Sequence, residues 1–274
     1  MASGTTDFVE LTAGPAVVGI APHAGGRLAS LTIAGVEFFI TERERGTDPL
    51  GWGAFAMVPW AGRVRRGRFA FEGRAYKLER NNPPDAIHGT AWSCPWDVLE
   101  TTPTMCRLAV DLGWPLGGRA VHTVELEPNA LNLTLEVHAG DTPIPAAAGW
   151  HPWWRRDLTA GGTVELSFKA ESRWERDSGR IPTGAIVDAG ERPPEGWDDC
   201  FTNVVDPVTL VWPGAAEVTI ESDCRELVIY DQPAHALCVE PQTAPPDPFN
   251  LGRFAQVEPG TPLRATTRWS WVLG

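Results

Sequence analysis

Residues 121–137 read VHTVELEPNALNLTLEV, and this stretch decides the fold class of the chain. From Leu131 to Val137, apolar residues occupy every second position, which is the pattern of a strand with one buried face. A second strand-like segment, Val121 to Leu126, precedes it across the turn-like residues Glu-Pro-Asn-Ala. Two such segments joined by a short turn predict an antiparallel β-hairpin.

The same pattern extends outward along the chain. Residues 28–33 and 36–40 flank Ala34-Gly35, and residues 69–71 and 75–78 flank Glu72-Gly73-Arg74, so two further hairpins are expected. No window holds an apolar stripe at helical spacing with caps, which predicts very little helix. Further strands are expected at 164–168, 217–220, 226–230, 236–239 and 263–271.

The length of 274 residues allows one large domain or two ordinary ones. Because no linker, composition break or repeat of fixed period divides the chain, residues 1–274 are predicted to form one domain. The fold class is all-β, a single large antiparallel β-sandwich with little helix. Four segments rich in proline and glycine are expected to be loops that, with the strand ends, carry the chemistry: 41–66, 139–162, 188–200 and 241–253.

Composition excludes several classes of function. A formal charge of −12 argues against a nucleic-acid partner, because phosphate binding depends on a basic surface. No apolar run approaches the roughly 18 residues of a membrane span, and residues 1–7 do not read as a signal peptide. The five cysteines form no C-x-x-C pair, so free thiols and a cytoplasmic location are expected, without a disulfide framework or structural zinc.

The chain has 13 tryptophans and only 2 tyrosines. Indole rings line β cores and also stack on sugars, and the core is expected to take the larger share. Trp153 and Trp154 cannot both face a ligand from an extended segment, so one of them is expected in the core. His122 continues the apolar face of its strand and is predicted to be a hydrogen-bonded core residue, whereas His138 is predicted to be exposed.

Four stretches place a polar group among tryptophan, proline and glycine. A histidine surrounded by three indoles, His151, would occupy a low-polarity pocket in which burial disfavours its charged form. Glu240 ends an apolar run, and an inward carboxylate there is costly unless it is paired or functional. The four stretches are Pro59–Arg68 with Arg63, Ala86–Gly89 with His88, Gly149–Trp154 with His151, and Cys238–Thr243 with Glu240.

In combination and order, these stretches resemble the aldose 1-epimerase (galactose mutarotase) family. The resemblance extends from about Arg27 to Trp271, and its His-Pro-aromatic-aromatic and Glu-Pro-x-Thr elements are the specific ones. It rests on Trp60-Ala61-Gly62-Arg63-Val64, Ile87-His88-Gly89, Gly149-Trp150-His151-Pro152-Trp153-Trp154, Asp198-Asp199-Cys200-Phe201, and Val239-Glu240-Pro241-Gln242-Thr243 through Asn250.

The resemblance implies a β-sandwich with a sugar-binding cleft. It implies an isomerase that interconverts the α and β anomers of a free aldose such as glucose or galactose, with no cofactor and no metal. The partner is then a small monosaccharide, and the chain a monomer or homodimer.

The resemblance also assigns roles to residues. Glu240 matches the catalytic base and His151 the catalytic acid, while Arg63, His88 and Asp198 match substrate-binding positions. Asp199 stays an alternative to Asp198. One departure concerns Gly62, because relatives often have asparagine at this position before the arginine.

The chemistry is consistent with these side chains. Opening a pyranose removes the proton of the anomeric hydroxyl and protonates the ring oxygen, which a carboxylate and an imidazolium on opposite sides can do together. A glycosidase would instead use two carboxylates roughly 5 to 9.5 Å apart. A carboxylate with an imidazole therefore favours isomerisation over hydrolysis.

Three alternatives stay open. A mutarotase for hexose phosphates could hold the phosphate with Arg65, Arg66 or Arg155. A non-catalytic sugar-binding module could keep the same cleft. A metal-dependent β-barrel enzyme could use several of the six histidines, although the sequence has no H-x-H and no two-histidine-plus-carboxylate run at ligand spacing.

Overall fold

The computed structural model describes residues 8–45, 48–205 and 207–274. The amino-terminal stretch 1–7, for which no signal peptide is expected, lies outside the described residues. In the part of the chain that is described, no helix is both long and apolar enough to cross a membrane.

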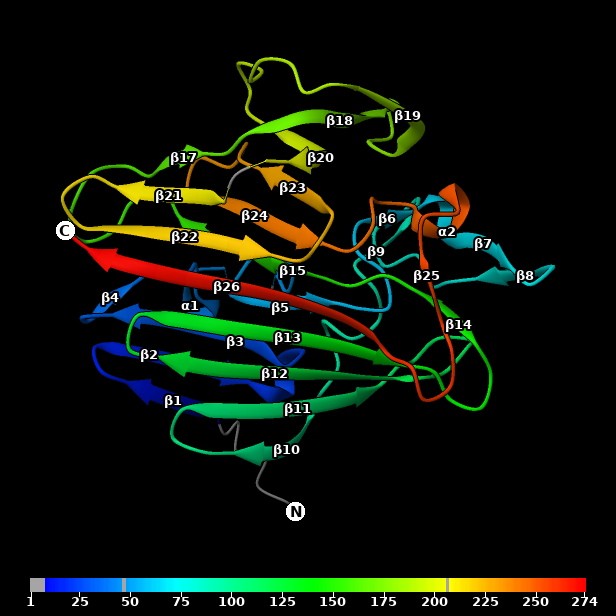
Figure 1. Ribbon diagram of the computed structural model, residues 1–274, viewed down its shortest axis with the longest axis horizontal. Helices are drawn as coiled ribbons and strands as arrows, with labels where there is room; N and C mark the ends of the chain where they lie inside the picture. Colours follow the sequence, from blue (N-terminus) through cyan, green and yellow to red (C-terminus); the bar gives the residue numbers. More distant parts are fainter. Residues whose placement is uncertain (1–7, 46–47, 206) are drawn as a thin grey trace.

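Strands dominate the described chain, and they pair in two large sheets (Figure 1). The twelve-stranded sheet has the order β1 (Val9–Ala13), β2 (Ala16–Ala21), β3 (Arg27–Ile33), β5 (Ala54–Met57), β15 (Gly149–Pro152), β24 (Ala236–Gln242), β23 (Glu226–Tyr230), β20 (Asp198–Val204), β18 (Ala170–Arg176) and β19 (Pro182–Asp188), with β4 (Val36–Glu37) beside β3 and β16 (Trp154–Arg155) beside β24. The eight-stranded sheet has the order β10 (Asp97–Thr101), β11 (Met105–Asp111), β12 (Arg119–Glu127), β13 (Ala130–His138), β26 (Leu263–Leu273), β22 (Ala216–Ser222), β21 (Val208–Trp212) and β17 (Glu165–Ser167).

Smaller elements gather at one end of the two sheets (Figure 1). They include the strand pairs β6 (Arg63–Val64) with β9 (Ala86–Ile87), β7 (Arg68–Phe71) with β8 (Arg74–Lys77), and β14 (Ile144–Ala146) with β25 (Ala255–Val257). Helix in the described residues is limited to the four-residue α1 (Glu42–Arg45) and α2 (Pro248–Leu251) and the 3₁₀ turns η1 (Pro22–Ala24) and η2 (Arg65–Gly67). The prediction of an antiparallel β-sandwich with little helix is confirmed.

The core lies between the two large sheets. Trp154 of β16 packs edge-on against Trp269 of β26, with ring centroids 5.2 Å apart, and Phe39 contacts both rings. All three side chains are fully buried. Because aromatic rings bury large apolar areas, this cluster contributes strongly to holding the sheets together.

The hairpin predicted over residues 121–137 forms, as β12 with β13. In the pairing of β12 with β13, Leu126 lies opposite Leu131, Val124 opposite Leu133 and His122 opposite Leu135, so one face of both strands is apolar. His122 is buried there and accepts a hydrogen bond from Trp150 Nε1 at 3.2 Å, which confirms the predicted core histidine. This bond connects the smaller sheet to β15 of the larger one.

The two other predicted hairpins also form, as β3 with β4 and β7 with β8. The prediction that the proline- and glycine-rich segments are loops is wrong in part. Segment 41–66 contains β5 and β6, segment 139–162 contains β14 to β16, and the other two segments hold the start of β20 and the end of β24. Every residue of β5 and of β15 is buried, so these central strands have no alternation to detect.

Several individual residues have the location that the sequence predicted for them. Trp154 is in the core, while Trp153, on the opposite face, stacks on His151. The side chain of His138 is partly exposed. All five cysteines carry free thiols.

Candidate active site

A cavity of about 270 Å³ opens above the central strands of the twelve-stranded sheet. Its volume suits a small ligand, since it lies close to the lower end of the range for small-molecule pockets. Its lining comes from β15, β24, β23, β20 and β18 together with the β6–β9 pair, and consists of Asp48, Leu50, Gly62, Arg63, Asn82, Ile87, His88, His151, Trp153, Arg176, Arg180, Asp198, Asp199, Cys200, Val228, Tyr230, Glu240 and Pro246. All five predicted site residues are among them.

His151 and Glu240 are brought together by neighbouring strands. Gly149 of β15 pairs with Gln242 of β24, and two residues further along each antiparallel strand the side chains of His151 and Glu240 meet on the same face. His151 Nε2 lies 3.4 Å from Glu240 Oε1, and both side chains are buried. The two residues predicted as acid and base therefore lie side by side in one cavity, and not on opposite sides of a sugar ring as expected from the sequence.

The ring of His151 is held between two aromatic rings. Phe55 of β5 stacks on it with centroids 4.9 Å apart, and Trp153 stacks with centroids 5.3 Å apart. Burial lowers the pKa of His151 to about 3, with a smaller contribution from the positive charge of Arg27. The low-polarity surroundings that the sequence predicted for this histidine are present, and they favour its neutral form.

Burial acts on Glu240 in the opposite sense. It raises the pKa of the carboxyl well above its usual range, and the negative charge of Asp198 raises it further. A raised carboxyl pKa beside a lowered imidazole pKa favours a pair that carries one proton and no net charge. Such a pair can release one proton and take up another while its net charge stays zero.

Arg63 and His88 are positioned by the short pair of β6 with β9, in which Arg63 lies opposite Ile87. Arg63 Nη1 donates to Asn82 Oδ1 at 3.0 Å, which fixes the guanidinium at the cavity wall. The backbone N–H of Gly62 donates to His88 Nδ1 at 3.3 Å. Since burial lowers the pKa of His88, its ring is neutral and Nε2–H is its remaining donor.

Asp198 and Asp199 both line the cavity, in different surroundings. Asp198 pairs with Arg176 at 3.4 Å and also with Arg180, and its side chain is about a fifth exposed. Asp199 is buried and pairs with Arg173 at 3.3 Å and with Arg176 at 3.2 Å. Asp198 therefore has the more accessible carboxylate of the two.

Several lining residues were missed by the sequence analysis, chiefly Asn82, Arg176, Arg180 and Tyr230. The two arginines come from β18 and the turn after it, a region for which no strand was predicted. The recurrence of arginine at 173, 176 and 180 was an available signal, but such a charge pattern is also typical of a solvated surface.

The three arginines considered for a phosphate do not line this cavity. Arg65 is exposed and pairs with Asp177 at 2.8 Å, and Arg155 pairs with Glu44. The charges of Arg65 and Arg155 are thus engaged by acidic partners outside this cavity.

Gly62 stands where a resemblance to the family leads one to expect asparagine. Its φ is +68°, and a β-carbon built there would lie 2.6 Å from the Cβ atom of Pro246. Pro246 therefore occupies the space of a side chain at position 62, and this part of the cavity wall is apolar instead of hydrogen-bonding.

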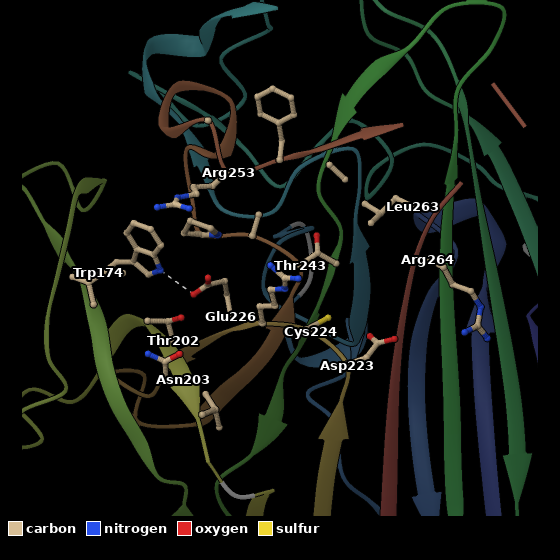
Figure 2. A pocket seen from close by; sticks show the side chains of 18 residues that line it. Trp174, Thr202, Asn203, Asp223, Cys224, Glu226, Thr243, Arg253, Leu263 and Arg264 are labelled. Carbon is tan, nitrogen blue, oxygen red and sulfur yellow. Dashed lines mark hydrogen bonds between the residues drawn. The ribbon is translucent and has the colours of Figure 1, made fainter. Parts of the chain in front are cut away.

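A larger cavity of about 870 Å³ lies between β18, β20 and β23 and the segment around α2 (Figure 2). Glu226 accepts a hydrogen bond from Trp174 Nε1 there at 2.8 Å, and burial raises the pKa of this carboxyl to about 7. It shares no lining residue with the smaller cavity and contains no histidine. We therefore assign the candidate active site to the smaller cavity, which holds the close pair of His151 and Glu240.

Comparison with known proteins identifies the family. Residues 7–270 match the family model described as aldose 1-epimerase. The uncharacterized protein YihR of Escherichia coli K12 is 26% identical over 265 residues, which cover 88% of this chain and 85% of YihR. The chain belongs to the aldose 1-epimerase family, as the sequence motifs predicted.

Solved structures agree with the fold. The GalM/aldose epimerase homologue from C. elegans matches with a TM-score of 0.82 and 19% identity, covering 98% of this chain and 99% of that one. A galactose mutarotase-like protein from Clostridium acetobutylicum matches with a TM-score of 0.83 and 16% identity, covering 97% and 95% of the two chains. At these low sequence identities, the similarity shows a shared fold alone.

Proposed function

We propose that this protein is an aldose 1-epimerase that interconverts the α and β anomers of a free aldose, with Glu240 as the base and His151 as the acid. The observation that carries the proposal is the 3.4 Å separation of His151 Nε2 and Glu240 Oε1 in a small buried cavity. Membership of the aldose 1-epimerase family supports the same reaction class.

In the proposed reaction, the carboxylate of Glu240 takes the proton of the O1 hydroxyl while His151 gives its proton to O5. The C1–O5 bond breaks with its electron pair on O5, and C1 becomes an aldehyde. Rotation about C1–C2 presents the other face of the carbonyl. The reverse transfers then close the ring, so no atom or electron is gained or lost.

The surroundings of the pair favour the ring-opening step. Opening converts an imidazolium and a carboxylate into a neutral imidazole and a carboxylic acid. Burial lowers the pKa of His151 and raises that of Glu240, so both shifts favour these neutral products. These shifts place the proton of the resting pair on Glu240, so it must pass to His151 across their 3.4 Å contact before the ring opens. From there the pair keeps a single proton throughout the cycle.

Three other lining groups would hold the sugar. Arg63 and the Nε2–H of His88 supply donors, and Asp198 supplies an acceptor. Sugar hydroxyls both donate and accept, so this mixture suits a polyhydroxylated ring. A cytoplasmic location is proposed too, supported by the free thiols.

Polarimetry tests the proposal. Catalytic amounts of protein are added to freshly dissolved α-glucose, α-galactose and other common hexoses and pentoses, and the change in optical rotation is followed. We expect a faster approach to anomeric equilibrium than in buffer for at least one sugar. Equal rates with and without protein for every sugar would contradict the function, and sugar binding in a calorimeter without turnover would favour a binding module.

A second candidate substrate is an aldose that carries an acidic group. The observation in its favour is that Arg63, Arg176 and Arg180 all line the cavity, although Asp198 and Asp199 engage two of them. Comparing kcat/KM for glucose and glucose 6-phosphate separates the two candidates, because a charged substrate would gain from the guanidinium groups.

A further inference from the structure

Beside the acid–base pair lies a third potential metal ligand, the thiol of Cys238. Among the described residues, His151, Cys238 and Glu240 place one nitrogen, one sulfur and one oxygen within 4.8 Å of one another. All three residues are buried. We propose that these three side chains bind a thiophilic divalent cation, Zn²⁺ above all, and that the ion blocks the site reversibly.

Strand geometry creates the cluster. Cys238 and Glu240 are two residues apart on β24, so their side chains share one face of the sheet. His151 approaches from the neighbouring β15, and Trp154 of β16 pairs with Leu237 just beyond it. Residues far apart in sequence thereby present three different ligand atoms to one point.

The distances are close to those of a tetrahedral zinc site. Zinc lies about 2.0–2.1 Å from nitrogen and about 2.0–2.2 Å from oxygen, so tetrahedral N and O ligands are roughly 3.4 Å apart. The observed separation of His151 Nε2 and Glu240 Oε1 is 3.4 Å. The Cys238 sulfur lies within 4.8 Å of both other ligand atoms.

The cavity provides room for a fourth ligand. His151 and Glu240 line it, whereas Cys238 lies beneath them without contributing to its surface. A three-residue zinc site with water or substrate in the fourth position is a common arrangement. Water could reach the ion from the cavity.

The ligand set determines which cations fit. Imidazole and thiolate select zinc and its softer neighbours, whereas Mg²⁺ and Ca²⁺ require oxygen ligands. Binding would occupy the lone pair of His151 Nε2 and the Glu240 carboxylate, the same groups that move protons in the proposed reaction. Inhibition thus rests on the proposed function, while binding of the ion does not.

Binding is tested first, with the whole protein and ZnCl₂ in a calorimeter. We expect one Zn²⁺ per chain and no heat from MgCl₂. Cys238→Ala should weaken zinc binding by more than about a hundredfold, because losing a direct ligand costs more than the roughly 10–100-fold of losing a ligand's hydrogen-bond partner. The matched control Cys224→Ala removes a thiol of the larger cavity and should bind zinc like the wild type.

Spectroscopy identifies the ligand. Co²⁺ bound in place of zinc should give a thiolate-to-cobalt absorption band in the wild type and in Cys224→Ala, and none in Cys238→Ala. Thermal unfolding of each variant checks that it is folded. Zinc binding that is as tight in Cys238→Ala as in the wild type, or absent from the wild type, would overturn the site.

Kinetic measurements then test whether bound zinc blocks the site. Zn²⁺ should slow mutarotation in competition with the sugar, and EDTA should restore the rate. Because Cys238 does not line the cavity, Cys238→Ala should keep its mutarotation and resist zinc. Mutarotation without zinc binding refutes this inference alone, whereas zinc binding at Cys238 without mutarotation of any sugar refutes the proposed function alone.

Discussion

The imidazole of His151 meets the carboxylate of Glu240 with Nε2 and Oε1 3.4 Å apart, at the base of a cavity that both residues line. Burial lowers the pKa of His151 to about 3 and raises that of Glu240 well above its usual range. The two groups therefore titrate as one pair that holds a single proton over a broad pH interval.

This proton count predicts the pH dependence of turnover. Activity should be lost on the acid side only when the pair takes up a second proton, near the lowered pKa of His151 of about 3. On the alkaline side it should be lost when the pair gives up its proton, above the ordinary carboxyl range. We expect kcat/KM, measured by polarimetry, to stay level through the ordinary histidine pKa of about 6.5. A decrease of kcat/KM on the acid side that is centred at the ordinary histidine pKa would contradict the titration of His151 and Glu240 as one pair.

Removing either member of the pair should abolish most of the catalysis. Glu240→Gln replaces the carboxyl with an amide of the same size, and His151→Asn replaces the imidazole with a smaller amide. General acid–base catalysis contributes about 10²–10⁴-fold, so kcat should fall by at least about a hundredfold. Calorimetry should still detect sugar binding in both variants. A Glu240→Gln protein with full activity would exclude Glu240 as the base.

Arg63→Ala and Asp198→Asn should act mainly on substrate affinity. Both residues line the cavity, so their loss should raise KM about tenfold with a smaller change in kcat. Asp198→Asn should also shift the alkaline limb to lower pH, because the Asp198 charge raises the pKa of Glu240. Arg65→Ala, at an exposed position outside the cavity, is the control. Unchanged KM in both variants would place the sugar elsewhere.

Gly62→Asn tests the close contact with Pro246. A β-carbon at position 62 would lie 2.6 Å from Pro246 Cβ, so the substitution should lower the free energy of unfolding by about 1–3 kcal/mol. Gly73→Asn is the matched control, since its φ is also positive, at +74°, and nothing lies within 4 Å of the added atom. Urea unfolding of both variants measures the difference. Equal stability of the two variants would mean that Pro246 moves aside with no loss of stability.

Glu226 makes folding stability depend on pH. Burial raises its pKa to about 7 from 4.5, so the folded chain binds more protons than the unfolded chain between these values. The contribution of Glu226 to the free energy of unfolding should therefore decrease as pH rises from about 4.5 to about 7, and it should stay constant at higher pH. Glu226→Gln should remove that decrease, making the variant about 1–3 kcal/mol more stable relative to the wild type at pH 8 than at pH 4.5.

Urea unfolding at both pH values measures this difference, with Glu125→Gln at an exposed position as the control. The Trp174 N–H can still donate to the glutamine oxygen, so the buried hydrogen bond is retained. The same pH dependence in Glu226→Gln and the wild type would assign the effect to other groups.

The sequence by itself determined the fold class and the family. Strict alternation from Leu131 to Val137 is a local property that requires one buried face, and the motifs around His151 and Glu240 identify the family. The tertiary structure decided what depends on register between strands. It placed Arg176 and Arg180 in the cavity, filled the space beside Gly62 with Pro246, and set Cys238 next to His151. Central strands such as β5 and β15 are buried on both faces, so their residues carry no pattern that reveals their neighbours.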